Sequence, residues 1–370
     1  MKLQSLRLAV ITGAMLLTGS GPAHSAVTYT FTDLGTLGGN MSHAYAINNA
    51  SQVVGWAGLP DGAGAHATRW DGTTVTDLGT LGGSYSAAYA INNVGQIAGG
   101  SSTGGDATHH ATRWDGNKAT DLDSLDGSYS NARGINNAGQ VVGVTSNYDG
   151  TNAHATRWDG TTATDLGRGF KSSARAINDA GQMAGSTSQY YGPARWDGAT
   201  VTELATLGGS YHAAYAINDA GQIVGYSMTA GNATVRAVRW DGTTATDLGT
   251  LGGRSSVAYA INNSGQVAGW AYANDVSVYH ATLWDGPTAI DLNSFLTPSE
   301  VSAGWVLIQA TGINDSGSIV GVAFNSWGLD RAFLMTPNPS VSAVPEPETY
   351  ALVLAALGGL GFTARRRKSV

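Results

Sequence analysis

The sequence predicts an all-β fold, a seven-bladed β-propeller, and three observations carry this prediction. A phrase centred on Ile-Asn occurs seven times along the chain, together with an Asp-Leu phrase and an Ala-x-x-Trp phrase. The spacing of these phrases is nearly constant, with a most common period of 44 residues. The chain is rich in Gly (52 of 370 residues) and only 12% charged, which suits neither a disordered nor a helical protein. Repeats of this length are typical of solenoids, propellers or arrays.

The three phrases mark equivalent positions in successive repeats. The first phrase has its Ile at Ile47, Ile91, Ile135, Ile177, Ile217, Ile261 and Ile313. The second has its acidic residue at Asp33, Asp77, Asp121, Asp165, Glu203, Asp247 and Asp291. The third ends at Trp70, Trp114, Trp158, Trp196, Trp240 and Trp284. Each of these Trp residues precedes the next acidic residue by 7 positions, so the parts of the repeat keep a fixed register.

Each repeat divides into four short strand candidates. In the clearest copy these are residues 67–70, 75–78, 87–91 and 96–99, and the Asp-Gly pair that follows Trp70 is a strong hairpin signal. Strands this short cannot stand alone, but four of them in 40-odd residues match one propeller blade.

The apolar residues of the repeat are expected to fill the space between neighbouring sheets. Each buried aliphatic or aromatic side chain contributes roughly 1.5–3 kcal/mol, and the contribution recurs in every repeat. In the clearest copy the expected core residues are Trp70, Leu78, Ile91 and Ile97, and the small residues expected to permit close packing are Ala88, Ala90 and Gly99.

The two ends of the repeat body indicate a closed ring. The body begins with residues 28–34, which read as a second strand without a Trp strand before it. It ends with residues 331–335, which read as a first strand without an Asp-Leu strand after it. Together the two partial repeats complete one blade, and closure by both termini leaves no open sheet edge. This favours the propeller over the alternative, a β-solenoid, which needs polar caps at its ends.

Both ends of the chain lie outside this body of residues 27–336. Residues 1–26 have the basic, apolar and small-residue regions of a secretory signal peptide. After a linker at 337–344, residues 345–370 contain Pro345, Glu346 and Pro347, a short apolar run at 350–364 and a basic cluster. That cluster, which suits a stop signal on the cytoplasmic side, consists of Arg365, Arg366, Arg367 and Lys368.

This C-terminal segment resembles the PEP-CTERM sorting signal of Gram-negative bacteria that make exopolysaccharide. The Pro-Glu-Pro motif, the short transmembrane helix and the Arg-rich end occur in the same order in both. The resemblance implies an exported protein that is held transiently in the inner membrane. It also implies an exosortase-type protease as a partner and the cell surface or extracellular matrix as the destination.

The body resembles the HAF-type extracellular repeat family, which is named for a His-Ala-Phe phrase. Here the third residue is usually Thr, as in His66-Ala67-Thr68, His110-Ala111-Thr112, His154-Ala155-Thr156 and His280-Ala281-Thr282, while Arg331-Ala332-Phe333 is the closest variant. The resemblance implies an extracellular location and a repeat architecture, and it implies no established activity.

Composition excludes several classes of site. Between residues 27 and 344 the chain keeps 13 of its 19 basic and 24 of its 26 acidic residues, so the formal net charge is about −11. An acidic body lacks the electrostatic footprint for nucleic acid. The chain has no Cys, and therefore no disulfides or thiolate metal sites.

The repeated polar residues are interpreted as structural. The His residues recur once per blade and would lie too far apart to share a metal. The Asn-Asn and Asn-Asp pairs, as at Asn218-Asp219, fit tight turns, with coordination of Ca²⁺ left as the alternative. The Trp-Asp pairs lack the Gly-His partner of WD repeats and read as hairpin turns. We therefore predict neither a metal nor a cofactor.

No catalytic constellation is recognisable, so we predict a protein that is not an enzyme. It would be an exported structural or binding component of the cell surface or exopolysaccharide matrix. Trp residues outside the repeat pattern are the candidate glycan contacts, namely Trp56, Trp270, Trp305 and Trp327. Two alternatives remain: a calcium-dependent adhesin, or a polysaccharide-acting propeller enzyme. The enzyme's site would lie in the central channel or under an insertion around residues 295–305, which is expected to form a short helix or a flap over one face. Its test positions are Trp305, Glu300 and Asp315.

Overall fold

The computed structural model describes residues 27–125, 129–167, 171–188, 192–274 and 278–338. Its compact repeat unit spans Tyr29–Pro337 and is all-β, with several sheets. The predicted signal peptide at 1–26 and sorting segment at 345–370 lie outside the described residues. No helix in the part of the chain that the structure describes is long and apolar enough to cross a membrane.

Four antiparallel strands in sequence order make up the basic unit of the fold. Sheet 1 contains β2 (Ser42–Ile47), β3 (Gln52–Gly58), β4 (Ala65–Asp71) and β5 (Thr74–Asp77). The Ile-Asn phrase closes the first strand of this unit, and the Ala-x-x-Trp phrase forms the third. The predicted hairpin between the third and fourth strands is present, with Gly72 in the left-handed region at φ 58°.

The same unit recurs along the chain. Sheet 2 contains β6 (Gly82–Ile91), β7 (Gln96–Thr103), β8 (His109–Asp115) and β9 (Lys118–Asp121); sheet 3 contains β10 (Tyr129–Ile135), β11 (Val141–Ser146), β12 (His154–Asp159) and β13 (Thr162–Asp165). Sheet 4 contains β14 (Lys171–Ile177), β15 (Gln182–Ser188), β16 (Gly192–Asp197) and β17 (Thr200–Glu203); sheet 5 contains β18 (Gly208–Ile217), β19 (Ile223–Thr229), β20 (Val235–Asp241) and β21 (Thr244–Asp247). Sheet 6 contains β22 (Gly252–Ile261), β23 (Val267–Ala273), β24 (Tyr279–Asp285) and β25 (Thr288–Asp291). Single parallel pairs, Ala65 with Tyr85 and His109 with Tyr129, link sheets 1 to 3.

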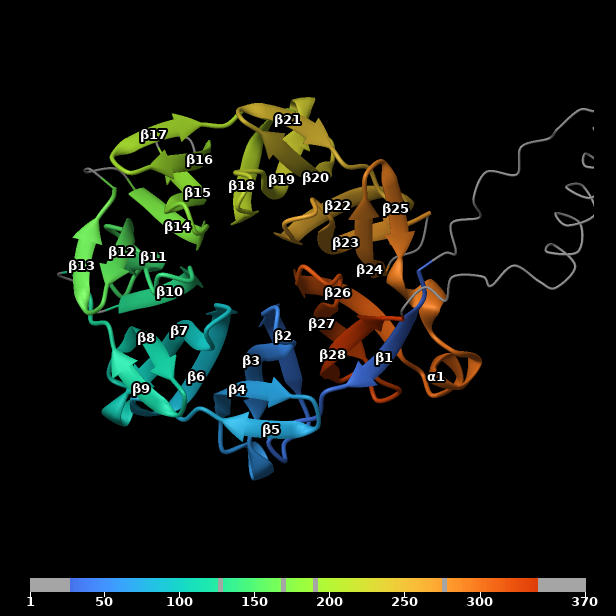
Figure 1. Cartoon of the computed structure of the whole chain (residues 1–370), viewed down its shortest axis with the longest axis horizontal. Helices are drawn as coiled ribbons and strands as arrows, with labels where there is room; N and C mark the ends of the chain where they lie inside the picture. The colour runs from blue at the N-terminus through green and yellow to red at the C-terminus, as the bar shows by residue number, and fades with distance from the viewer. Residues whose placement is uncertain (1–26, 126–128, 168–170, 189–191, 275–277, 339–370) are drawn as a thin grey trace, which may run out of the picture. The chain divides into compact units, whose positions relative to one another are not determined.

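Sheet 7 is built from both ends of the compact unit. Its strands are β26 (Val306–Ile313), β27 (Ile319–Phe324), β28 (Asp330–Pro337) and β1 (Tyr29–Asp33), and β1 pairs with β28 from Tyr29 opposite Pro337 to Asp33 opposite Phe333. Arg331 Nη2 donates to Asp33 Oδ2 at 2.8 Å across the same two strands. The predicted joining of the two partial repeats is therefore confirmed. In Figure 1, β2, β6, β10, β14, β18, β22 and β26 surround a common centre.

Hydrogen bonds between the innermost strands run all the way round this centre. The side-chain amide of Asn48 donates to the backbone carbonyl of Asn92 at 3.1 Å, and each equivalent Asn does the same to the next sheet. The remaining donors are Asn92, Asn136, Asn178, Asn218, Asn262 and Asn314, and the last of these donates back to the carbonyl of Asn48. These bonds thus form an unbroken circle, and each of these amides is buried.

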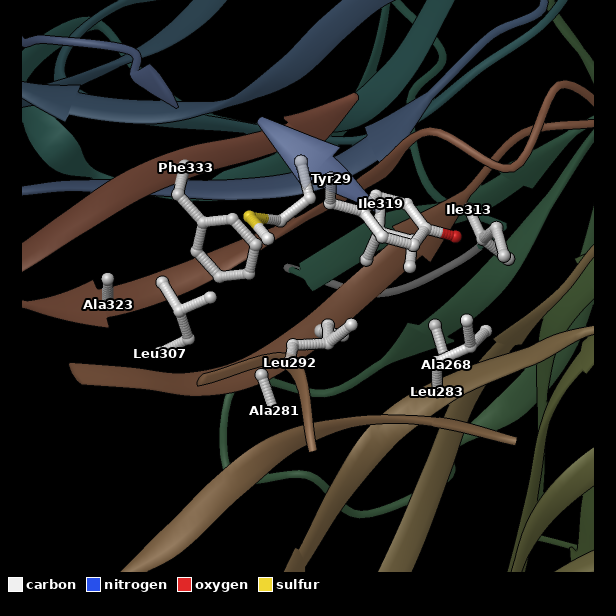
Figure 2. Packing of buried hydrophobic residues seen from close by; sticks show 12 residues of the cluster. Tyr29, Ala268, Ala281, Leu283, Leu292, Leu307, Ile313, Ile319, Ala323 and Phe333 are labelled. Carbon is white, nitrogen blue, oxygen red and sulfur yellow. The ribbon is translucent and has the colours of Figure 1, made fainter. Parts of the chain in front are cut away.

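The hydrophobic core lies between neighbouring sheets, as predicted. Leu78 from the end of sheet 1 packs with Ile91, Ile97 and Trp114 of sheet 2, and all four are buried. The equivalent cluster at sheet 7 is larger, and Figure 2 shows Tyr29 and Phe333 in it beside aliphatic residues of β26 and β27. Because each cluster contains residues of two sheets, apolar burial stabilises the contact between them.

Gly99 is needed for close packing within one sheet, and not between sheets as predicted. A Cβ at this position would lie 2.0 Å from the backbone oxygen of Ala87, on the neighbouring strand of the same sheet. The register between the two strands shifts between Ala88 and Ala90, so the backbones approach closely there. The glycine therefore permits close strand pairing within one sheet, whereas Ala88 does lie between sheets.

Short helices occur only in connections within the described residues. They are η1 (Pro60–Gly62), η2 (Gly104–Asp106), η3 (Ala230–Asn232), η4 (Leu292–Phe295) and α1 (Pro298–Ser302). The last confirms the short helix predicted in the insertion, and a capping box between Thr297 and Glu300 begins it. Figure 1 shows α1 at the rim of the ring, beyond β1.

Candidate binding site on the ring axis

One position on each innermost strand faces the axis of the ring. It lies two residues before the Ile of each Ile-Asn phrase, at the point where the pairing register with the next strand shifts. The seven residues at this position are Tyr45, Tyr89, Arg133, Arg175, Tyr215, Tyr259 and Thr311, in order round the ring. Two arginines in adjacent sheets are therefore flanked on each side by two tyrosines.

These seven residues, with Gln309, line a cavity of about 390 Å³. Ligand pockets typically measure about 300–1,000 Å³, so the cavity suits a small ligand or one unit of a longer chain. No acidic residue is among the described residues that line it. The cavity therefore offers aromatic faces, hydroxyl groups and two guanidinium groups.

Each arginine lies over the ring of the neighbouring tyrosine. The guanidinium carbon of Arg133 is 4.4 Å from the ring centroid of Tyr89, and that of Arg175 is 4.8 Å from that of Tyr215. Such cation–π contacts hold a guanidinium in place without neutralising it. The side chains are thus held at the cavity wall while their positive charge remains available.

Arg175 is half-buried. Its Nε is enclosed and has no hydrogen-bond partner among the described residues. Burial lowers the pKa of Arg175, and repulsion from Arg133 lowers it further. The guanidinium remains protonated because arginine is effectively always charged in proteins, so a positive charge without an acidic partner lies at this wall of the cavity.

The tyrosines form two pairs. The ring centroids of Tyr45 and Tyr89 are 5.2 Å apart, and those of Tyr215 and Tyr259 are 5.4 Å apart. Burial raises the pKa of Tyr215 to about 12, while the nearby Arg175 opposes that rise. The phenol of Tyr215 therefore stays neutral at physiological pH and can both donate and accept hydrogen bonds.

His109, which is outside the lining of the cavity, is affected by the charge of Arg133. The ring of His109 stacks on Tyr129 with centroids 5.3 Å apart. Burial, followed by the charges of Arg133 and His110, lowers the pKa of His109 to about 4. His109 is therefore neutral at physiological pH, and the cavity's positive charge comes from the arginines.

The structure places two of the four predicted glycan contacts next to this cavity. Trp56 Nε1 donates to the hydroxyl of Tyr45 at 3.2 Å, and Trp270 Nε1 donates to that of Tyr259 at 3.1 Å. These two tryptophans therefore hydrogen-bond to tyrosines that line the cavity.

The other two predicted contacts do not line the cavity. Trp305 packs against Phe31 with ring centroids 5.1 Å apart, while Trp327 is 83% exposed on the loop between β27 and β28. The four tryptophans therefore do not form one surface.

The second cavity on the axis, of about 210 Å³, is lined by the Ile-Asn-Asn and Ile-Asn-Asp segments. Their second side chains form another circle of bonds, in which the Asp219 oxygen, for example, accepts from the backbone N–H of Asp179 at 3.0 Å. The other Asp219 oxygen accepts from Asn263 Nδ2 at 2.9 Å. These segments occupy turns, and their side-chain groups bond to one another across sheets.

The repeated histidines bind carboxylates on the neighbouring strand. His66 Nδ1 lies 2.9 Å from Asp77 Oδ2, and the same pairing joins His110 to Asp121, His154 to Asp165 and His280 to Asp291. Within the described residues, no three His, Asp or Glu side chains gather in a way that could hold a metal.

The positions chosen for an enzymatic site have separate roles. The Glu300 carboxylate accepts from the backbone N–H of Thr297 at 2.7 Å in the capping box. Asp315 accepts from the backbone N–H of Asn263 at 2.9 Å, in the circle of bonds formed by the second polar residue of each Ile-Asn-Asn or Ile-Asn-Asp segment. Trp305 packs on Phe31, as described above. The structure thus gives each of these residues a local structural partner.

The arginine–tyrosine wall was missed in the sequence. Its signal was present, because the residue two before each repeated Ile is Tyr in four copies, Arg in two and Thr in one. The candidate glycan contacts were aromatic residues outside the repeat pattern, whereas the cavity is lined by residues at a variable position inside the repeat.

Comparison with known families gives information on the C-terminal segment. Residues 343–368 match the PEP-CTERM protein-sorting motif, which includes the predicted Pro345, Glu346 and Pro347. This motif indicates an exported protein that an exosortase system sorts and that is anchored in the membrane before processing. No curated protein matches the chain significantly.

Proposed function

We propose that residues 27–336 form a seven-bladed β-propeller that acts outside the cell as a non-enzymatic binding protein. Its place would be the surface or exopolysaccharide matrix of a Gram-negative bacterium, reached after exosortase processing. The circular order of the sheets supports the architecture, since β1 completes the sheet of β28. The resemblance to HAF-type repeats agrees with an extracellular role.

The observation that carries the binding role is the cavity on the ring axis. Its four tyrosines present aromatic faces and hydroxyl groups. Aromatic walls with a few fixed polar groups are the usual composition of ligand sites. A polysaccharide has both apolar ring faces and many hydroxyl groups, so it fits both properties of this wall.

The non-enzymatic part of the proposal rests on the chemistry of the same wall. General acid–base cleavage of a glycosidic bond normally needs two carboxyl groups on opposite sides of it. The described residues that line the axial cavity provide arginines, tyrosines, Gln309 and Thr311 instead. These groups are suited to binding and orientation.

The test is a binding assay with full-length protein in mild detergent and a panel of acidic and neutral polysaccharides, with chain length followed in the same samples. Binding without shortening supports the proposal. Shortening would favour the enzymatic alternative, and the absence of binding to every polysaccharide would contradict the binding role. Unfolding that shifts on addition of EDTA would favour the calcium-dependent alternative.

A matched pair of variants locates the site. Tyr259→Ala removes one aromatic face of the cavity and is expected to weaken binding at least about tenfold, or about 1.4 kcal/mol. Tyr211→Ala is the control, because Tyr211 is 61% exposed and outside the cavity. A third variant, Trp327→Ala, tests the remaining exposed candidate. Equal binding by the Tyr259→Ala variant and the unchanged protein would remove the cavity from the proposal.

A further inference from the structure

The two arginines of the axial cavity are placed in a way that neutral ligands do not require. They come from adjacent sheets, on β10 and β14, at the same position of the repeat where four other sheets have tyrosine. The described wall has no carboxylate to neutralise them. Both arginines are half-buried. A positive charge withdrawn from water without an acidic partner is costly, and it tends to be found where a ligand supplies the missing charge.

The surroundings make the two guanidinium groups available as a pair. Arg133 rests on Tyr89 and Arg175 on Tyr215, so each is supported from outside the pair. Burial is the main cause of the lowered pKa of Arg175, and the positive charge of Arg133 lowers it further. An anion between them would relieve this repulsion.

The geometry of the donors selects the kind of anion. A guanidinium presents parallel N–H groups that match the two oxygens of a carboxylate. Two guanidinium groups beside each other can hold one such group from two sides. The tyrosine pairs flank the arginines, so the body attached to the carboxylate would meet aromatic faces and phenol hydroxyls.

We infer that the axial cavity binds the carboxylate of an acidic sugar residue between Arg133 and Arg175, with the sugar ring against the flanking tyrosines. The inference deepens the proposed function and rests on it, since it specifies acidic over neutral polysaccharide. The cavity, of about 390 Å³, limits the tightly held part to a small portion of the chain. The rest of the polysaccharide would extend from the open end of the cavity.

The first experiment compares two ligands that differ only in charge. One is an oligoglucuronan, and the other is the same oligosaccharide with every carboxylate reduced to a primary alcohol. Both are titrated calorimetrically into the full-length protein in mild detergent. We expect the acidic ligand to bind about 10- to 100-fold more tightly, the range set by one charge-assisted hydrogen-bonded pair. Equal affinities would overturn the inference while leaving the proposed function intact.

Variants assign the preference to the arginine pair. Arg175→Gln is expected to abolish the difference between the two ligands, and Arg133→Gln to reduce it. Arg239→Gln is the control, because Arg239 pairs with Asp241 at 2.9 Å and is not part of the wall. If Arg175→Gln keeps the full preference for the acidic ligand, the arginine site is refuted.

A stability measurement separates loss of the site from loss of the fold. Removing an unpartnered buried charge relieves a cost, so the melting temperature of Arg175→Gln without ligand is expected to equal or exceed that of the unchanged protein. Loss of preference together with a lower melting temperature would count against a specific binding role. An Arg175→Lys variant, which retains charge and loses the paired donors, should keep less than a tenth of the affinity for the acidic ligand.

Two further ligands test the source of the anion. Free glucuronate should compete with the oligosaccharide, since it carries the same carboxylate and ring. Stronger competition by inorganic phosphate than by glucuronate would overturn the assignment in favour of a phosphate site. Stronger competition by a peptide through its terminal carboxylate would overturn the assignment to polysaccharide.

Discussion

Removal of one side-chain amide from the circle of hydrogen bonds formed by the seven buried Asn residues should lower the free energy of unfolding of the whole fold. Asn218 is buried, and its Nδ2 donates to Gln222 Oε1 at 2.9 Å and to the backbone oxygen of Asn262 at 3.1 Å. Its Oδ1 accepts from the backbone N–H of Gln222 at 2.9 Å. Each such bond contributes about 0.5–1.5 kcal/mol, so Asn218→Ala should cost about 3 kcal/mol.

The assay is urea unfolding of residues 27–344, followed by tryptophan fluorescence. The matched control is Asn263→Ala, which also removes hydrogen bonds between sheets but from an exposed side chain. Water replaces exposed bonds, so this variant should lose less than about 1 kcal/mol. Equal losses for Asn218→Ala and Asn263→Ala, or a loss below about 1 kcal/mol for the buried position, would refute the reasoning.

Asn218→Asp extends the test to pH. A carboxylate keeps the acceptor towards Gln222 N but faces the Asn262 carbonyl without a donor. Burial and that carbonyl would raise the pKa of the introduced acid above its unfolded value, so the ionised form would be disfavoured in the folded state. The loss of stability should therefore be greatest at neutral pH and shrink as pH falls through the raised folded pKa. A loss independent of pH would contradict this account.

Two other predictions concern the sheets themselves. Trp240→Phe should destabilise the protein by about 1 kcal/mol more than Trp114→Phe in urea unfolding. The reason is that Trp240 Nε1 donates to Ala205 O at 2.7 Å, whereas Trp114 Nε1 has no partner among the described residues. Equal losses for the two variants would contradict this prediction. The hydrogen bond to Asp291 raises the pKa of His280 against the opposing effect of burial, so the pair stabilises the fold below about pH 6.5 and this contribution is lost as pH rises through the folded pKa. Comparing the melting temperature of His280→Asn with that of the unchanged protein from pH 5 to 8 should reveal this difference, and parallel curves would exclude it.

Much of the fold could be predicted from the repeat pattern. Ile91 and Trp114 occur at fixed intervals because each fills the same space between two sheets, so their spacing reports the packing directly. The pairing of β1 with β28 was also predictable, since each end of the body carries one half of a repeat. Gly99 was assigned correctly to a crowded place but for the wrong neighbour, because a register shift within a sheet leaves no clear trace in sequence.

The axial cavity was harder to predict because it belongs to no single repeat. Arg133 and Arg175 are 42 positions apart, and only the circular arrangement brings them together at one wall. Their position in the repeat was visible, but which face of the innermost strand meets the axis depends on the bulge near the Ile-Asn phrase. Trp327 was a candidate contact because it lies outside the repeat pattern, but it is on an exposed loop and does not line the cavity.

The pairing of β1 with β28 determines how the ring would respond to mechanical force. Tyr29 lies opposite Pro337, so a pull applied at these two residues would open the antiparallel ladder from one end, one pair of bonds at a time. This is the least resistant direction for such a ladder. A protein held through its C-terminal segment and loaded through the axial cavity would carry the force differently. The load would enter through Arg133 and Arg175 on β10 and β14, and it would reach β28 across the contacts between sheets.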